Sequence, residues 1–515
     1  MESPQADEWK QAMDEEIASM YANSVWTLVD LPKDRRAIGT KWVLKLKLSS
    51  SGVIERYKAR LVAKGYTQQY GIDYDETYSP TVRHSTLRVI MAIVAHLDLE
   101  LHQMDVKTAF LNGELEEEIY MEQPEGYISP GNEHLVCQLH RSIYGLKQSS
   151  RQWYCKFHAS LTEYGFVVCY DDECVYTLSS GDKFAILTLY VDDILLASND
   201  IDYLNGIKTW LSSQFQMKDM SDAAYFLGIK ITRERSARKL WLSQQTYINK
   251  VLERFDMDAC LPADTPVICG HNLSSELGPK NAAQRKQMKG TRYLEAVGCL
   301  LYAMICTRPD ISFAVGLVGR FQSNPGPSHW KAVKRIMRYL RGTSDYALCY
   351  QGGSQELQLT GYSDADYGGD LDQRKSTTGY AFLLSHGLVS WKSQKQSCIS
   401  LSTMEAEYVA LCETAKEAVW LKRLVKSLLG PGFKTTPVNV FCDNQAAVNA
   451  TKESKFHSRT KHIDIKYNHA KLMVKEKEMN LQSISTEDMV ADPMTKPLTR
   501  SLFHKHLIAM GLSRK

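Results

Sequence analysis

Two adjacent carboxylates, Asp192 and Asp193, stand inside an otherwise apolar stretch of the sequence. They follow Tyr190 and Val191 in the run FAILTLYVDDILLAS (184–198). Burying unpaired charge is costly, so a chain tolerates such a pair where something compensates it. A divalent cation such as Mg²⁺, which prefers oxygen ligands, is one compensator. On the dipeptide alone, a polar hairpin turn closed by the two aspartates is an equally good interpretation.

A third carboxylate, Asp105, follows the alternating, strand-like run Leu99–Met104. A lone aspartate at a strand end is commonly a helix N-cap. With Asp192 and Asp193, however, Asp105 could hold two Mg²⁺ ions, which stabilise the attacking and leaving oxygens of a phosphoryl transfer. The three aspartates therefore favour a two-metal phosphoryl-transfer site.

A second set of acids lies in the last third of the chain. Asp364 ends the predicted strand in LTGYSDAD, Asp443 ends the predicted strand VNVFCD, and Asp492 precedes a proline. Glu405 and Glu407 lie at the start of a predicted helix. Taken singly, each has an ordinary structural explanation, such as a turn, an N-cap, a helix-dipole charge or a surface acid.

Hydrophobic periodicity predicts the elements that position these acids. Residues 7–23 have helical spacing, residues 41–66 alternate as two strands around a turn at 49–52, and residues 85–96 indicate a buried helix. Phe184–Ser198 predicts two short strands that meet at the aspartate pair. After residue 351, strands followed by alternating helix and strand predict a compact α/β domain.

Pro and Gly clusters at 256–290 and a Gly-Gly-Ser at 352–354 mark the boundaries between domains. We expect four segments: 1–255, a mostly helical 256–350, an α/β domain at 351–500, and a C-terminal tail at 501–515.

Charge is uneven although the net charge is only +3. Residues 31–70 hold ten Lys or Arg and two acids, and residues 311–344 hold six and none. Such blocks can neutralise phosphates, although a solvated helix face explains any single block equally well.

The twelve cysteines form no C-x-x-C pair, which predicts free thiols. Without an apolar run of membrane length or a signal peptide, the chain is expected to be soluble and intracellular.

Three motifs occur in a recognisable order: QMDVKTAFLNGEL (103–115), SIYGLKQSSRQW (142–153) and YVDD (190–193). They resemble the polymerase motifs of the copia-type LTR retrotransposon Pol polyprotein, and KWVLKLK…ERYKARLVAKGYTQ (41–68) resembles its fingers. The resemblance covers nearly the whole chain. It implies an α+β and α/β multidomain protein: a right-hand polymerase with fingers, palm and thumb or connection, followed by a ribonuclease H-like α/β domain.

The resemblance assigns roles to individual residues of the polymerase part. Asp105, Asp192 and Asp193 would bind the metals, and Phe110 would be a steric gate against the ribose 2′-OH, unless it is plain core packing. The basic fingers residues expected at the triphosphate or template phosphates are Lys58, Arg60 and Lys64. The residues expected to line the nucleotide and template pocket are Gly145, Lys147 and Gln148.

For the second set of acids the resemblance implies a ribonuclease H centre of Asp364, Glu407, Asp443 and Asp492 around two Mg²⁺ ions. Glu405 remains an alternative to Glu407. The run HSRTKHIDIKY (457–467), with Arg459, Lys461 and His462, would bring positive charge near the scissile phosphate.

Two further features bear on function. The family has Pro where this chain has Ser150, which would free one φ angle in a loop beside the active site and reduce activity.

Residues 328–342 predict an amphipathic helix with Trp330 and Val333 on its apolar stripe. Its basic face, which includes Lys334 and Arg338, is either solvated or follows the backbone of the template–primer duplex.

The sequence thus favours an RNA-directed and DNA-directed DNA polymerase with ribonuclease H activity. Mg²⁺, or Mn²⁺ in its place, would be the cofactor. The expected partners are an RNA template, a DNA primer, dNTPs, the RNA–DNA hybrid and other Pol and capsid-like products of the same element, with no membrane. We expect the protein to be located in the cytoplasm, within a virus-like particle, or in the nucleus.

Two other classes compete with this interpretation. A non-catalytic nucleic-acid-binding remnant would have eroded carboxylates, and a capsid-like protein would need a zinc knuckle or coat-forming helices. No D-[ST]-G protease motif or His-His-Cys-Cys module occurs. We therefore expect a processed product, a truncated genomic copy or a partial gene.

Overall fold

The computed structural model describes residues 5–48, 53–271, 273–353, 356–430, 433, 436–452 and 464–515. The chain divides into two compact units. Unit 1 comprises Met1–Val82, His102–Val168 and Glu173–Ser221, and unit 2 comprises Arg83–Leu101, Cys169–Asp172 and Asp222–Lys515. In the described ranges, no helix has both the length and the apolar character needed to cross a bilayer.

Unit 1 is built around a sheet with strand order β11-β4-β10-β9-β8-β7. These strands are β4 (Glu100–Val106), β7 (Val167–Cys169), β8 (Asp172–Ser180), β9 (Lys183–Tyr190), β10 (Asp193–Ser198) and β11 (Met217–Asp222). The predicted pair of strands around the aspartates is confirmed as the antiparallel hairpin β9–β10, in which Asp193 pairs with Tyr190.

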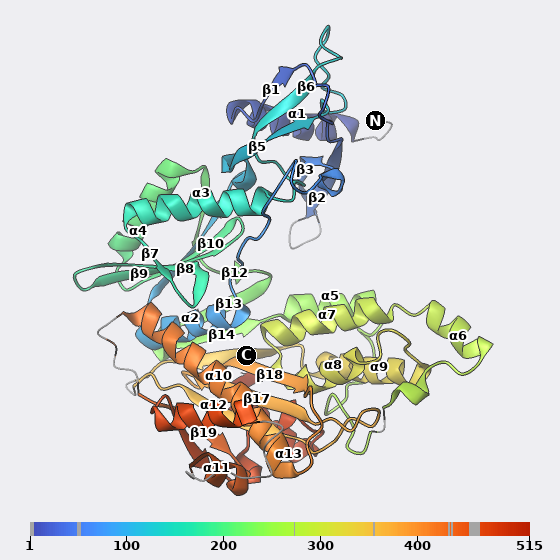
Figure 1. The fold of residues 1–515 in the computed structure, drawn as a ribbon, viewed down its shortest axis with the longest axis vertical. Helices are drawn as coiled ribbons and strands as arrows, with labels where there is room; N and C mark the ends of the chain where they lie inside the picture. The colour runs from blue at the N-terminus through green and yellow to red at the C-terminus, as the bar shows by residue number, and fades with distance from the viewer. Residues whose placement is uncertain are drawn as a thin grey trace. The chain divides into compact units, whose positions relative to one another are not determined.

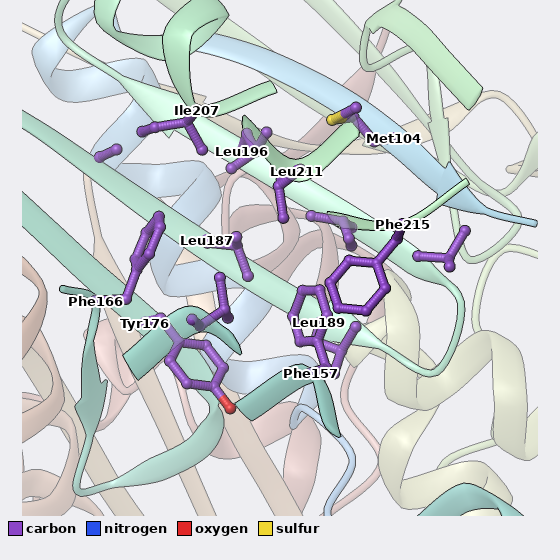
Figure 2. Packing of buried hydrophobic residues seen from close by; sticks show 14 of the residues in the cluster. Met104, Phe157, Phe166, Tyr176, Leu187, Leu189, Leu196, Ile207, Leu211 and Phe215 are labelled. Atoms are coloured by element: carbon purple, nitrogen blue, oxygen red, sulfur yellow. The ribbon is translucent and has the colours of Figure 1, made fainter. Parts of the chain in front are cut away.

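Two helices, α3 (Ser149–Tyr164) and α4 (Ile201–Gln214), cover one face of this sheet (Figure 1). Their buried side chains repeat at helical spacing, as Phe157 and Leu161 do on α3 and Ile207 and Leu211 on α4. They pack on sheet residues such as Leu187 in one apolar cluster (Figure 2). This packed layer holds the β9–β10 hairpin in place.

The rest of unit 1 is a smaller substructure of strands and one helix. Helix α1 (Ala6–Ala22) confirms the expected N-terminal helix, and its buried Met13, Ile17 and Met20 lie on the predicted face. Strands β1 (Trp26–Val29), β6 (Val136–Arg141) and β5 (Glu114–Met121) form one sheet, and β2 (Thr40–Leu48) pairs with β3 (Ile54–Ala63). The turn expected at 49–52 lies outside the described residues.

Unit 2 contains a sheet of order β12-β13-β14-β15-β21. Its strands are β12 (Tyr225–Phe226), β13 (Ile229–Glu234), β14 (Lys239–Ser243), β15 (Tyr346–Gln351) and β21 (Leu512–Arg514). The buried helix expected at 85–96 is α2 (His84–Leu97). The segment expected to be mostly helical, 256–350, contains α6 (Ala282–Lys289), α7 (Tyr293–Cys306), α8 (Ser312–Gly319) and α9 (Pro327–Gly342), and α5 (Gln245–Arg254) precedes it. The domain boundaries expected from sequence stay a prediction.

The C-terminal part of unit 2 has the sheet order β18-β17-β16-β19-β20. Strands β16 (Thr360–Ala365), β17 (Thr377–Leu384) and β18 (Gly387–Lys395) are antiparallel, whereas β19 (Val438–Cys442) and β20 (Met479–Ser483) continue the sheet in parallel. Helix α10 (Thr403–Leu429) packs on β16 and β17, and α11 (Gln445–Lys452), α12 (Asp464–Lys475) and α13 (Arg500–Ala509) complete it. This is the α/β arrangement that the strand and helix pattern predicts.

Candidate active sites

The three polymerase acids come together on neighbouring strands of unit 1. Asp105 is the second-last residue of β4, and β4 lies beside β10, which begins at Asp193. The backbone N–H of Val106 donates to the carbonyl of Asp192 over 2.9 Å, which ties the strand of Asp105 to the β9–β10 turn. All three carboxylates are half-buried at this edge.

The turn that carries the aspartate pair has an unusual backbone. Val191 has φ 57°, a left-handed conformation that a β-branched residue rarely adopts. The indole Nε1 of Trp153 on α3 donates to the Val191 carbonyl over 2.6 Å and so holds the turn. Conformations of this kind cost roughly 1–3 kcal/mol and are concentrated at functional sites. The two aspartates therefore do lie at a hairpin turn, and the strained backbone of Val191 is of the kind that is concentrated at functional sites.

Repulsion among the acids is visible in their proton affinities. Burial and then the charge of Asp192 raise the pKa of Asp105, while lysines led by Lys58 oppose this rise. Burial is also the largest cause that raises the pKa of Asp193, and the neighbouring carboxylates add to it, although Gln103 donates a hydrogen bond to Asp193 over 3.1 Å. A cation between these groups would relieve both effects.

The fingers residues approach this cluster through an aromatic side chain. The guanidinium of Arg60, on β3, lies 4.4 Å from the ring centroid of Tyr144. The ring of Phe110 packs on the same Tyr144, with the two ring centroids 4.8 Å apart, and Phe110 is only half-buried. This position fits both a steric gate and a packing role. Lys58 and Arg60 share one face of β3, as the alternation of a strand requires. Lys64, six residues after Lys58, directly follows that strand.

The pocket residues expected in SIYGLKQ hold a loop against β3. Gly145 has φ 97°, and a Cβ there would lie 2.1 Å from the carbonyl of Ala63, so only glycine fits. Gln148 is fully buried and donates to the carbonyl of Asp73 over 2.8 Å. The exposed Lys147 donates to the Tyr74 hydroxyl over 2.8 Å. Contact of these three with a nucleotide stays a prediction.

The expectation for Ser150 was wrong in one respect. Ser150 lies in the first turn of α3, with Gln148 as the N-cap, and not in a loop. The φ angle there is already set by the helix, and Pro is tolerated in a first helical turn because its missing N–H has no intrahelical partner there. The change from Pro therefore acts mainly on the entropy of the unfolded chain.

The acids predicted to form the second metal centre converge in unit 2. Strands β16 and β19 are parallel, with Ser363 beside Cys442, so the next residues, Asp364 and Asp443, lie side by side at the carboxyl ends of these strands. Asp492 begins a short 3-10 turn that packs over β17, and it is 1% exposed. Gly379 pairs with Asp364, and a Cβ there would lie 2.6 Å from Thr495, so the close approach of this turn requires glycine.

The two helix glutamates have different environments. Glu405 accepts a hydrogen bond from the backbone N–H of Leu401 over 2.7 Å, and its own N–H donates to the N-cap Ser402 over 3.2 Å. That is a capping arrangement for α10. Glu407 is also buried, but its Oε2 has no hydrogen-bond partner, and it lies close to Asp443. The geometry therefore favours Glu407 as the ligand.

Carboxylate oxygens crowd this centre. The ligand atoms of Asp364, Asp443 and Asp492 lie within 4.8 Å of one another, as do those of Glu407, Cys442 and Asp443. Within the described part of the chain these are the groups of three so placed, and the unit 1 triad is not among them. Three carboxylates and an orphaned buried Oε2 fit a hard cation such as Mg²⁺ better than the soft thiol of Cys442 does.

Burial and the neighbouring charges set the proton affinities of this cluster. Burial, followed by the charges of Asp364 and Asp443, raises the pKa of Glu407 well above its ordinary value. Burial and Asp364 raise the pKa of Asp492 to about 7, against the opposing charge of Lys496. Lys496 Nζ lies 2.9 Å from Asp492 and 3.6 Å from Asp364, so it supplies part of the missing positive charge.

Sequence and structural comparisons bear on both sites. Residues 23–269 match the family model described as Reverse transcriptase (RNA-dependent DNA polymerase). A putative transposon Ty5-1 protein of Saccharomyces cerevisiae is 35% identical over 315 residues, which are 61% of this chain and 100% of that protein. The chain belongs to the reverse transcriptase family of transposon Pol proteins.

The resemblance to copia-type Pol is confirmed along most of this chain. A retrovirus-related Pol polyprotein from transposon TNT 1-94 of Nicotiana tabacum is 48% identical over 511 residues, which are 98% of the chain and 38% of that polyprotein. The chain thus spans little more than a third of that relative. The structure of a foamy viral protease-reverse transcriptase dRH in complex with ds DNA covers 93% of this chain and 70% of its own, at TM-score 0.52 and 13% identity. This likeness concerns the fold, and it confirms the expected fold class.

Sequence reasoning missed two residues of these candidate sites. Tyr144 joins Arg60 to Phe110, and the available signal was its place inside the motif SIYGLKQ. Lys496 follows Asp492 by four residues, a spacing that brings charges together in a helical turn. Arg459, Lys461 and His462 lie outside the described residues.

Proposed function

We propose that this chain is an RNA-directed and DNA-directed DNA polymerase that also cuts the RNA strand of an RNA–DNA hybrid. The observation that carries the proposal is that acidic side chains gather in each unit of a chain of the reverse transcriptase family: Asp105, Asp192 and Asp193, whose charges affect one another, in unit 1, and the candidate ligand group of Asp364, Asp443 and Asp492 in unit 2. Its substrates would be dNTPs, an RNA or DNA template with a DNA primer, and the hybrid. Other Pol and capsid-like products of the element would be its partners.

In unit 1, Asp105, Asp192 and Asp193 would hold two Mg²⁺ ions. The bound ions would stabilise charge on the attacking and leaving oxygens of the phosphoryl transfer. The strained turn at Val191, held by Trp153, orients the aspartate pair before substrate arrives. Lys58 and Arg60 would offer positive charge to the triphosphate or the template.

In unit 2, Asp364, Glu407, Asp443 and Asp492 would hold the metals for cleavage of RNA. Lys496 forms ion pairs with both Asp492 and Asp364 and offsets part of their negative charge. Thr495 donates a hydrogen bond to Asp364 and fixes the orientation of that carboxylate.

The proposal is tested with one preparation and two substrates: dNTP incorporation on a primed RNA template, and cleavage of labelled RNA in a hybrid, each with Mg²⁺ and with EDTA. Both activities should require the metal. A non-catalytic binding remnant would instead bind the primed template and show neither reaction.

Phe110→Val is expected to admit ribonucleotides. The half-buried Phe110 packs on Tyr144 close to the acids, and a smaller side chain would leave room for a 2′-OH without altering a metal ligand. Incorporation of rNTP should rise by ~10-fold or more, because excluding one hydroxyl by a clash is worth a few kcal/mol at most. The measurement is kcat/KM for rNTP against dNTP. An unchanged ratio would leave Phe110 with a packing role alone.

Glu407→Gln and Glu405→Gln should separate the two helix glutamates. Glu407→Gln is expected to abolish RNA cleavage, since it removes a charge that faces Asp443. Glu405→Gln keeps an acceptor for the Leu401 N–H and should retain most cleavage, whereas Glu405→Ala should lower stability by about 1 kcal/mol as a lost cap does. Equal loss of cleavage in both glutamine variants would reject this assignment.

Mg²⁺ should stabilise the protein more above pH 7 than below it. Folding raises the pKa of Asp492 from 3.8 to about 7. Between these two pH values the folded state holds more protons than the unfolded state, so the free energy of unfolding falls as the pH rises toward 7. A cation replaces the lost proton. The gain in melting temperature on adding Mg²⁺ should therefore be larger at about pH 8 than at about pH 5. Asp492→Asn should reduce this difference, and a gain independent of pH would contradict it.

A further inference from the structure

A cavity of about 620 Å³ lies in unit 2 between α8, α9 and residues of 257–271 and Leu273. Both helices belong to the helical part of the unit (Figure 1). The lining contains none of the residues of the two carboxylate centres. Its volume is in the range of sites for small organic ligands, roughly 300–1,000 Å³. Its floor is apolar and consists of Met257, Pro266, Val267, Ile268, Leu273, Ala314, Leu317, Val318, Ala332 and Ile336.

The polar part of the lining has one sign of charge. Lys331, Lys334, Arg335 and Arg338 line the cavity together with His271 and Ser328, and no lining residue is acidic. Within the described residues, none of the four cations forms an ion pair. The cavity thus combines an apolar floor with positive charge that no lining residue compensates.

Two of these cations are already engaged by the protein. Arg335 donates to the hydroxyl of Thr265 over 3.1 Å, and Arg338 donates to the carbonyl of Leu261 over 2.7 Å. These bonds attach α9 to the segment that closes the cavity, so the arginines shape the site. They also reduce the basic face that the sequence suggested for a nucleic-acid duplex. Lys331 and Lys334, which lie three residues apart on one side of α9, remain free to meet a ligand.

We propose that this cavity binds a small amphipathic organic anion, with its apolar body on the floor and its acidic group at Lys331 and Lys334. Burial of apolar surface would supply most of the affinity, and the lysines would select the charge. The site is independent of the two proposed catalytic centres and would exist even if either activity were absent.

The test uses the full chain and three probes with the same alkyl chain: dodecanoate, dodecanol and dodecyltrimethylammonium, each measured by calorimetry below its micelle concentration. Dodecanoate should bind saturably, and the other two should bind about 10-fold more weakly or not at all, since neither can form a charge-assisted hydrogen bond with the lysines. Equal binding of the three probes would overturn the proposal.

Variants locate the binding. Ala332→Trp fills the cavity and should abolish dodecanoate binding, with Ala332→Leu as a milder substitute if the tryptophan variant does not fold. Lys334→Gln should weaken dodecanoate binding by about 10-fold, whereas Lys286→Gln, an exposed lysine on α6 outside the cavity, should not. Undiminished binding in both Ala332 variants would reject the site. Displacement of dodecanoate by an RNA–DNA hybrid, with loss of hybrid binding in Lys334→Gln, would assign the lysines to nucleic acid instead.

Discussion

Replacing Asp192 or Asp193 by Asn is expected to abolish DNA synthesis while RNA cleavage in a hybrid continues. Each change removes a negative charge from a centre where burial and like charges already raise the pKa of Asp193. The metals would lose a ligand that stabilises several kcal/mol of charge in the transition state, so synthesis should fall by ~10³-fold or more.

The measurement is primer extension beside hybrid cleavage on the same preparation. Asp202→Asn is the matched control, because Asp202 is an exposed aspartate in the first turn of α4. Lys208 on the same helix is unsuitable because it forms an ion pair with Asp219. Asp202→Asn should leave both activities near wild type. Loss of both activities in a folded Asp192→Asn variant would mean that the two centres are not independent.

Asp443→Asn is expected to have the opposite effect. Asp443 belongs to both groups of candidate ligand atoms in unit 2, so its replacement should disturb cleavage more than any other single change there. RNA cleavage should fall by ~10³-fold or more, and primer extension should persist. Stability without metal should not fall, because the change removes one of the charges that raise the pKa of Glu407.

Cleavage of a labelled hybrid in Mg²⁺ provides the readout for Asp443→Asn, and thermal unfolding in EDTA provides the stability. Glu476→Gln, which removes an exposed acid that follows α12 and lies outside the centre, is the matched control for charge. Retained cleavage in Asp443→Asn, with normal metal dependence, would exclude Asp443 as a ligand.

The parts of the fold that depend on local pattern could be predicted from the sequence. Two apolar stretches on either side of the polar pair Asp192 and Asp193 predict a hairpin, and helical spacing of apolar residues predicts α1 and α2. The choice between Glu405 and Glu407 needed coordinates: both are buried, and the difference is that Glu405 bonds the Leu401 N–H whereas Glu407 Oε2 has no hydrogen-bond partner. Periodicity cannot reveal which of two buried acids has its charge satisfied.

Contacts between distant segments were beyond sequence reasoning. Asp492 precedes a proline in a polar stretch and is typical of a surface acid, yet it is 1% exposed because its turn packs over β17 at Gly379. Residues 512–514 resemble a tail but pair as β21 with β15. In both cases a partner more than a hundred residues away decides the environment.

The most direct test of the central claim is incorporation of dTTP on poly(rA) primed with oligo(dT), using the purified chain and Mg²⁺. We predict template-dependent synthesis that EDTA abolishes and that Asp193→Asn lacks. Folded protein that binds the primed template but incorporates no dTTP with Mg²⁺ or Mn²⁺ would contradict the account.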